Sequence, residues 1–215
     1  MQNDSRLNVI GTGFVEVMRM GQRLQAAFLA NESTAEPAPW AGFLSDPDDL
    51  AAFARREALR YMQSVTQARP LIQLLSHKFG GMIALMQMPE TRKEQAAIAS
   101  VLRVVLATSP VKAYWMVYEA WMATAHRGAP DEHVPPSERP DRREVAVVIS
   151  ATPQSFRIIC HGITRDAAGK VTDLPEPVEM EGGEWTANNL MMGNLFDSVE
   201  KIAALHASLD RGSGR

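Results

Sequence analysis

The sequence predicts an α+β fold, with a mixed, mostly antiparallel sheet of about five or six strands and helices packed on it. Two patterns lead to this class. Apolar residues recur at helical spacing in some segments, while shorter apolar and β-branched runs, bounded by Gly and Pro, have the composition of strands. The expected order is helix, helix, strand, strand, helix, four strands and a last helix. With 215 residues, 46% of them apolar and 22% charged, the chain can bury a substantial core.

Two helices are expected in the N-terminal part. The first covers 14–30, where apolar residues fall at helical spacing: Phe14, Val17, Met18, Leu24 and Phe28. Residues 31–45 are polar and contain prolines, so we expect a linker. The second helix covers 46–67. It starts at Asp46, whose carboxylate can accept hydrogen bonds from free backbone N–H groups, and Pro47 suits the first helical position.

A β-hairpin and a third helix are expected next. Residues 71–77 and 82–88 are short apolar runs, and Gly80-Gly81 between them would supply the positive φ of a tight turn. One continuous helix is the alternative, which the glycine pair disfavours. The third helix covers 91–108 and opens with Thr91 and Glu94, at the spacing of a capping box.

Strands dominate the part that follows. Residues 111–122 are apolar on both alternating faces, which indicates a central strand covered on both sides. A strand, a helix and another strand in succession favour a parallel crossover. After a loop over 123–143, an antiparallel meander is expected, with strands over 144–151 and 156–164 and a short strand from Val171. A last helix is expected near 194–209.

The domain organisation and the location follow from composition. We expect 1–45 to be an N-terminal helix and linker, 46–210 a single α+β domain and 211–215 a flexible tail. The chain has no run of about eighteen apolar residues that could span a membrane, and its first residues lack the apolar stretch of a secretory signal. The single cysteine, Cys160, cannot form an internal disulfide, so a cytoplasmic protein is expected.

The charges argue against nucleic acid as a partner. The formal net charge is −3, and the arginine pairs Arg55-Arg56 and Arg142-Arg143 are each followed directly by a glutamate. A nucleic-acid binder usually concentrates Lys and Arg on one face. We therefore expect neither a nucleic acid nor a membrane as the partner.

Glu119 is the most unusual residue of the expected central strand, because it shares a face with Trp115 and Trp121. Burying an ionised carboxylate is costly unless it is paired or hydrogen-bonded. Glu119 is therefore either a structural residue, at the solvent-exposed end of the strand or paired with an arginine such as Arg142 or Arg143, or a carboxylate of raised pKa or a metal ligand in a cleft. The structural interpretation is preferred.

Two segments resemble a known family. Glu119-Ala120-Trp121-Met122, followed by Pro136-Ser137-Glu138-Arg139-Pro140-Asp141-Arg142-Arg143-Glu144, resembles a family of uncharacterised bacterial and phage-borne proteins. The resemblance covers roughly residues 70–175. No activity is established for that family, so the resemblance implies a site location and a prophage or mobile-element origin but no reaction. The matching positions are Glu119, Trp121, Pro136, Ser137, Pro140, Asp141, Arg142 and Glu144.

If the two strands that carry these segments are neighbours, their charged residues gather at one edge of the sheet. The candidate cluster consists of Glu119, Trp121, Ser137, Asp141, Arg142 and Glu144. In one arrangement, Arg142 holds Glu119 while Asp141 caps the loop. In the other, three carboxylates surround a divalent cation. The first is favoured, because an arginine inside the cluster competes with a cation.

Two functions are expected from different classes. The preferred one is a non-enzymatic accessory or protein-interaction protein without a cofactor or metal, since catalytic signatures are missing and Trp40 and Trp185 fall in expected loops. Its partner would be another protein, or a second copy of the chain. The alternative is a small metal-dependent hydrolase or nuclease that uses Glu119, Asp141 and Glu144. Cys160 and His161 are strand neighbours that point to opposite faces, so they form no nucleophile–base pair.

Overall fold

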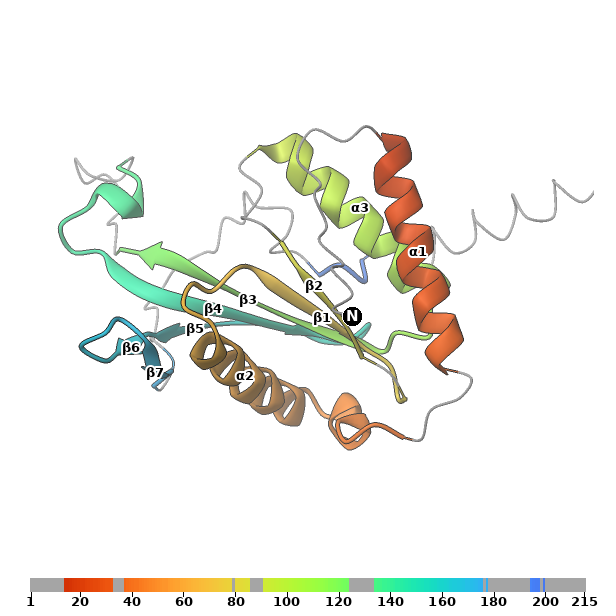
Figure 1. The fold of residues 1–215 in the computed structure, drawn as a ribbon, viewed down its shortest axis with the longest axis horizontal. Coiled ribbons are helices and arrows are strands. Elements are labelled where there is room, and N and C mark those ends of the chain that lie inside the picture. The colour runs from red at the N-terminus through yellow and green to blue at the C-terminus, as the bar shows by residue number, and fades with distance from the viewer. Residues whose placement is uncertain are drawn as a thin grey trace, which may run out of the picture.

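The computed structural model describes residues 14–32, 37–78, 80–85, 91–123, 134–175, 177, 194–197 and 199. Within these residues the α+β class is confirmed: three helices pack on a five-stranded antiparallel sheet, and two further strands form a hairpin (Figure 1). The α-helices are α1 (Phe14–Glu32), α2 (Pro47–Ser64) and α3 (Arg92–Thr108). Most of the expected C-terminal helix, and the tail over 211–215, lie outside the described residues.

The remaining elements are short 3-10 helices and strands. The 3-10 helices are η1 (Ala41–Ser45) and η2 (Pro136–Glu138). The strands are β1 (Leu71–Leu75), β2 (Gly80–Ala84), β3 (Ala113–Met122), β4 (Arg143–Ala151), β5 (Phe156–Gly162), β6 (Thr164–Arg165) and β7 (Val171–Asp173). The strand expected over 156–164 is therefore divided into β5 and β6 by Ile163. None of the described helices is long and apolar enough to cross a membrane.

The sheet lies between two helical layers. α1 and α3 cover one face and α2 covers the other, as Figure 1 shows. Alternate residues of β3 therefore enter different cores: Tyr114 and Met116 pack on the α3 side, and Trp115 and Val117 on the α2 side. All six residues from Ala113 to Tyr118 are buried, which confirms the central strand covered on both faces.

The N-terminal ends of α2 and α3 form as their sequences predict. The carboxylate of Asp46 accepts hydrogen bonds from the backbone N–H groups of Asp48 (2.7 Å) and Asp49 (3.1 Å). Thr91 Oγ1 accepts from the Glu94 N–H (3.2 Å), and the Glu94 carboxylate accepts from the Thr91 N–H (3.1 Å), which completes the capping box. The expected linker is only partly irregular, because its last five residues form η1.

The hairpin is present, but its glycines have another role than the one predicted. Gly80 and Gly81 pair with Leu75 and Leu74 inside the β1–β2 ladder, so the turn lies before them. The reason for a glycine at position 80 is space. A Cβ atom there would lie 2.9 Å from Cζ2 of Trp40, whose Nε1 donates to the Ser76 carbonyl (2.9 Å).

The sheet order is β2-β1-β3-β4-β5, and all neighbouring strands are antiparallel. Both β2 and β3 run antiparallel to β1, so they are parallel to each other. The connection through α3 is therefore a parallel crossover, as predicted, but β1 lies between the two strands that it joins. The predicted turn before Val171 is also present: it joins β6 to β7 and contains Gly169, with a φ of 79°.

Candidate functional site

The ends of β3 and β4 form the part of the sheet where the two family-like segments meet. In the register of this pair, Glu119 lies opposite Ala146 and Trp121 opposite Glu144. This confirms that the two segments are neighbours. Glu119, Trp121 and Glu144 share the face of the sheet that α2 covers further along, since Trp115, Val117 and Ala146 belong to the α2-side core. In Figure 1 this end of the β3–β4 ribbon projects beyond α2.

The hairpin of β6 and β7 lies beside α2 and brings a third segment to this face (Figure 1). α2 holds the hairpin through two side chains. Gln63 donates to the Thr172 carbonyl (2.8 Å), and Arg55 donates to the Leu174 carbonyl through Nε (3.2 Å) and Nη2 (2.6 Å). As a result, Arg165 of β6 points toward the ends of β3 and β4.

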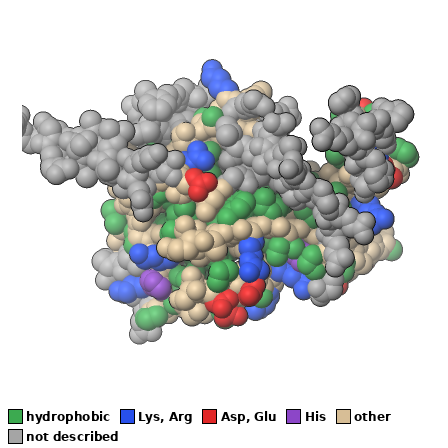
Figure 2. Space-filling view, turned by 180° about the vertical axis from the view of Figure 1, so that it is seen from behind, with side chains coloured by type: hydrophobic (Ala, Val, Ile, Leu, Met, Phe, Trp, Pro, Cys, Tyr) green, Lys and Arg blue, Asp and Glu red, His purple; other side chains and the backbone are tan. Residues whose placement is uncertain are grey.

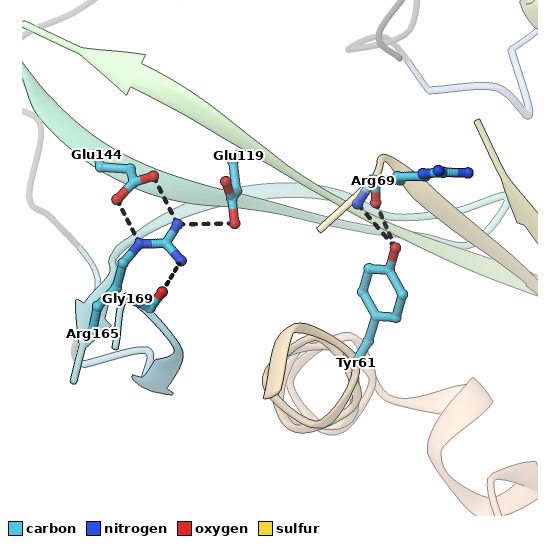
Figure 3. Close-up of polar contacts among 6 residues, drawn as sticks. All are labelled: Tyr61, Arg69, Glu119, Glu144, Arg165 and Gly169. Carbon is cyan, nitrogen blue, oxygen red and sulfur yellow. Dashed lines mark hydrogen bonds and ion pairs between the residues drawn. The ribbon is translucent and has the colours of Figure 1, made fainter. Parts of the chain in front are cut away.

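Arg165 joins both glutamates of the site, as Figure 3 shows. Its Nε donates to Glu144 Oε2 (3.0 Å), and its Nη2 donates to Glu144 Oε1 (2.7 Å) and to Glu119 Oε1 (3.1 Å). Its Nη1 donates to the Gly169 carbonyl (3.0 Å). All three charged side chains are between 27% and 30% exposed, so the group is partly shielded from water.

These hydrogen bonds raise the pKa of Arg165 and create no reactive group. The hydrogen bond with Glu144 is the main cause that raises the pKa of Arg165 above its ordinary value, and Glu119 adds to it, while partial burial acts in the opposite direction. Arg165 therefore stays charged, and its charge is shared by two carboxylates. The chemical result is a fixed ion-pair group on the surface.

The predicted partners of Glu119, Arg142 or Arg143, are wrong: among the described residues, Arg165 holds this carboxylate. The guanidinium carbon of Arg142 lies 5.0 Å from the ring centroid of Trp121, and its Nη1 donates to the Ser137 carbonyl. The sequence offered no local signal for Arg165, because Arg165 and Glu119 are 46 residues apart and meet only through the docking of the β6–β7 hairpin.

Asp141 and Ser137 also differ from their expected roles. Asp141 accepts two hydrogen bonds from Arg139, from Nε (3.0 Å) and from Nη2 (3.2 Å). Arg139 is 5% exposed, so this pair anchors the loop before β4, and sequence reasoning did not identify that arginine as part of the site. Ser137 contributes its backbone carbonyl to the Arg142 contact.

The predicted cluster is thus brought together only in part. Glu119 and Glu144 share Arg165, Trp121 stacks with Arg142, and Asp141 binds Arg139. Across the described ranges, no group of three or more His, Cys, Asp or Glu side chains is placed to hold a metal ion. The arrangement of three carboxylates around a cation therefore does not form among these residues.

Cys160 and His161 lie on opposite faces of β5, as predicted. Cys160 is buried in the α3-side core, and this burial raises the pKa of its thiol. The Nδ1 atom of His161 lies 2.8 Å from the Pro175 carbonyl oxygen, at hydrogen-bonding distance. The two side chains therefore belong to separate environments.

Trp121 is the large apolar residue exposed within the cluster, with an exposed fraction of 46%. Other exposed large apolar residues of the described chain are Leu29, Met82 and Val134. From behind, the Lys and Arg side chains are scattered among apolar and acidic ones rather than gathered in a continuous basic face (Figure 2).

Compared with protein-family models, with curated proteins and with solved structures, the chain gives no match. The resemblance described above therefore stays a prediction, and the functional argument depends on the geometry of this site.

Proposed function

We propose that this is a non-enzymatic interaction protein that binds a protein partner through the exposed end of the β3–β4 ribbon. The observation that carries the proposal is the exposed indole of Trp121, stacked with Arg142. Tryptophan and arginine are the side chains most enriched among residues that dominate binding energy at protein interfaces. Here both stand together at one end of the molecule.

The surroundings of Trp121 are suited to binding because they are already ordered. Glu144, its partner across the ladder, is held by two hydrogen bonds from Arg165. Arg142 is held by the Ser137 carbonyl and by the indole itself. Side chains that are fixed before binding lose less conformational entropy when a partner arrives. The ion pairs of the site therefore support recognition by positioning its surface.

The alternative, a metal-dependent hydrolase or nuclease, lacks a group of carboxylates that could hold its metal among the described residues. Its three proposed carboxylates are divided between two arginines, Arg165 and Arg139, in the described chain. The family resemblance favours an accessory protein of prophage or mobile-element origin. The single buried cysteine favours a reducing compartment such as the cytoplasm.

The test is purification of the tagged full chain from the cell that produces it. Wild type should retain a discrete partner in stoichiometric amount, and Trp121→Ala should lose it, because truncating a central interface residue weakens binding by about thirtyfold or more. Met82→Ala is the matched control, since Met82 is exposed on β2, away from the site. A partner that Trp121→Ala retains, or the absence of any stoichiometric partner, would contradict the proposal.

A further inference from the structure

We infer that the partner is recognised through an acidic segment, whose carboxylate binds Arg142 while a neighbouring apolar side chain lies on Trp121. This inference rests on the proposed function and specifies the chemistry of the partner. It starts from the arginines near the ribbon end, which are Arg139, Arg142, Arg143 and Arg165.

These four arginines fall into two pairs. Arg139 and Arg165 are hydrogen-bonded to carboxylates of the same chain. Arg142 and Arg143 are exposed, and within the described residues neither forms an ion pair. The carboxylates nearest to them in sequence, Asp141 and Glu144, are already bonded to the first pair. Arg142 and Arg143 thus present guanidinium groups that these two carboxylates do not pair.

Arg142 is also in the geometry that suits a carboxylate. A guanidinium has five N–H donors in one plane, and it binds a carboxylate most strongly through two parallel hydrogen bonds. The guanidinium carbon lies 5.0 Å from the Trp121 ring centroid, and the Ser137 carbonyl accepts a hydrogen bond from Nη1. The other edge of the guanidinium keeps donors for a ligand. A flat indole beside a fixed cation fits an acidic residue next to an aromatic or aliphatic one.

A phosphate backbone would also bind an exposed arginine, so nucleic acid is the competing partner class. The surroundings favour the peptide. Glu119, Glu144 and Asp141 lie near the same ribbon end, and a long polyanion would have to pass close to them. Nucleic-acid binding also depends on many Lys and Arg contacts spread along the strand, whereas basic side chains are scattered on the face seen in Figure 2. A short peptide can place one carboxylate on Arg142 and keep its other groups away from Glu119, Glu144 and Asp141.

Replacing Glu138 tests whether the partner carries negative charge. This residue is exposed on η2, next to Ser137, whose carbonyl holds Arg142. If the partner is acidic, the charge of Glu138 opposes binding. Glu138→Gln should therefore strengthen the complex, whereas a partner held only by apolar contact would not respond.

The experiment is an NMR titration of the full chain with a short peptide in which phenylalanine is flanked by aspartates, at up to about 1 mM. The indole N–H signal of Trp121, assigned with Trp121→Phe, should shift. Arg142→Gln should weaken binding by about tenfold or more, because a charge-assisted hydrogen-bond pair is lost. Arg142→Lys should restore part of the affinity, and Glu138→Gln should raise it.

The controls separate this inference from the proposed function. The same peptide with asparagine in place of aspartate should bind about tenfold more weakly. Equal binding of both peptides, no shift with either, an Arg142→Gln variant that binds like wild type, or stronger binding of a single-stranded oligonucleotide would overturn the inference. In each of these cases the Trp121-dependent capture of a partner would still support the proposed function, and its loss alone would remove that function.

Discussion

Arg165 holds two carboxylates from neighbouring strands with one guanidinium. Glu119 and Glu144 are diagonal neighbours in the β3–β4 ladder, where like charges repel each other. The arginine converts this repulsion into attraction and ties the β6–β7 hairpin to the sheet. Its role is therefore to position Glu144 and the surface beside Trp121.

Replacing Arg165 tests this role. We expect Arg165→Met to lower the free energy of unfolding by about 1–2 kcal/mol, because two partly shielded carboxylates lose their common donor. Urea denaturation is the measurement. Arg142→Met is the matched control and should cost less, since Arg142 lies over the exposed Trp121 and holds neither glutamate. Equal losses for the two variants would show that the ion pairs do not stabilise the fold.

At the scale of elements, the hairpin shows how a glycine is selected by a distant side chain. Trp40 lies in the segment before η1, yet its indole packs against the β2 backbone at Gly80 and contacts Phe53 of α2, with 6.5 Å between ring centroids. This contact connects the segment before α2 to an edge strand of the sheet. The glycine is needed because the indole comes so close.

Gly80→Ala should therefore destabilise the protein by about 1–3 kcal/mol, since the added Cβ would overlap the Trp40 ring. Gly42→Ala is the control, because nothing lies within 4 Å of a Cβ at that position. Thermal unfolding of both variants checks the expectation. In a Trp40→Phe background the smaller ring should reduce the cost of Gly80→Ala, and the same cost in both backgrounds would rule out this contact as the reason.

At the scale of the whole molecule, α1 is part of the core. Phe28 is 1% exposed and packs with residues of α3 and of the sheet. Packing of this kind favours a single cooperative unit.

Phe28→Ala should lower the free energy of unfolding by about 3–5 kcal/mol, through the loss of a buried aromatic ring. Circular dichroism and tryptophan fluorescence should still report one common transition at lower denaturant concentration. Leu29→Ala is the control, because Leu29 is adjacent to Phe28 but 50% exposed. If Phe28→Ala does not fold, Phe28→Leu gives a smaller loss of stability. An unchanged transition in Phe28→Ala would indicate that α1 is independent.

Much of the fold could be predicted because its signals are local. Asp46, Thr91 and Glu94 mark helix starts through hydrogen bonds that span two or three residues. The pairing of β3 with β4 was a condition of the predicted cluster rather than a prediction, and the structure shows that pairing. The partner of Glu119 was not predictable, because it depends on how α2 holds the β6–β7 hairpin through Gln63 and Arg55.

The sequence by itself determined the class of the fold, the starts of α2 and α3 and the burial of β3 on both faces. These properties depend on periodicity and on contacts between near neighbours. Only the tertiary structure decided that Arg165 binds Glu119, that Arg142 stacks on Trp121 and that Trp40 requires Gly80. The physical reason is that such contacts join segments tens of residues apart or depend on side-chain rotamers, and packing selects them after the elements have formed.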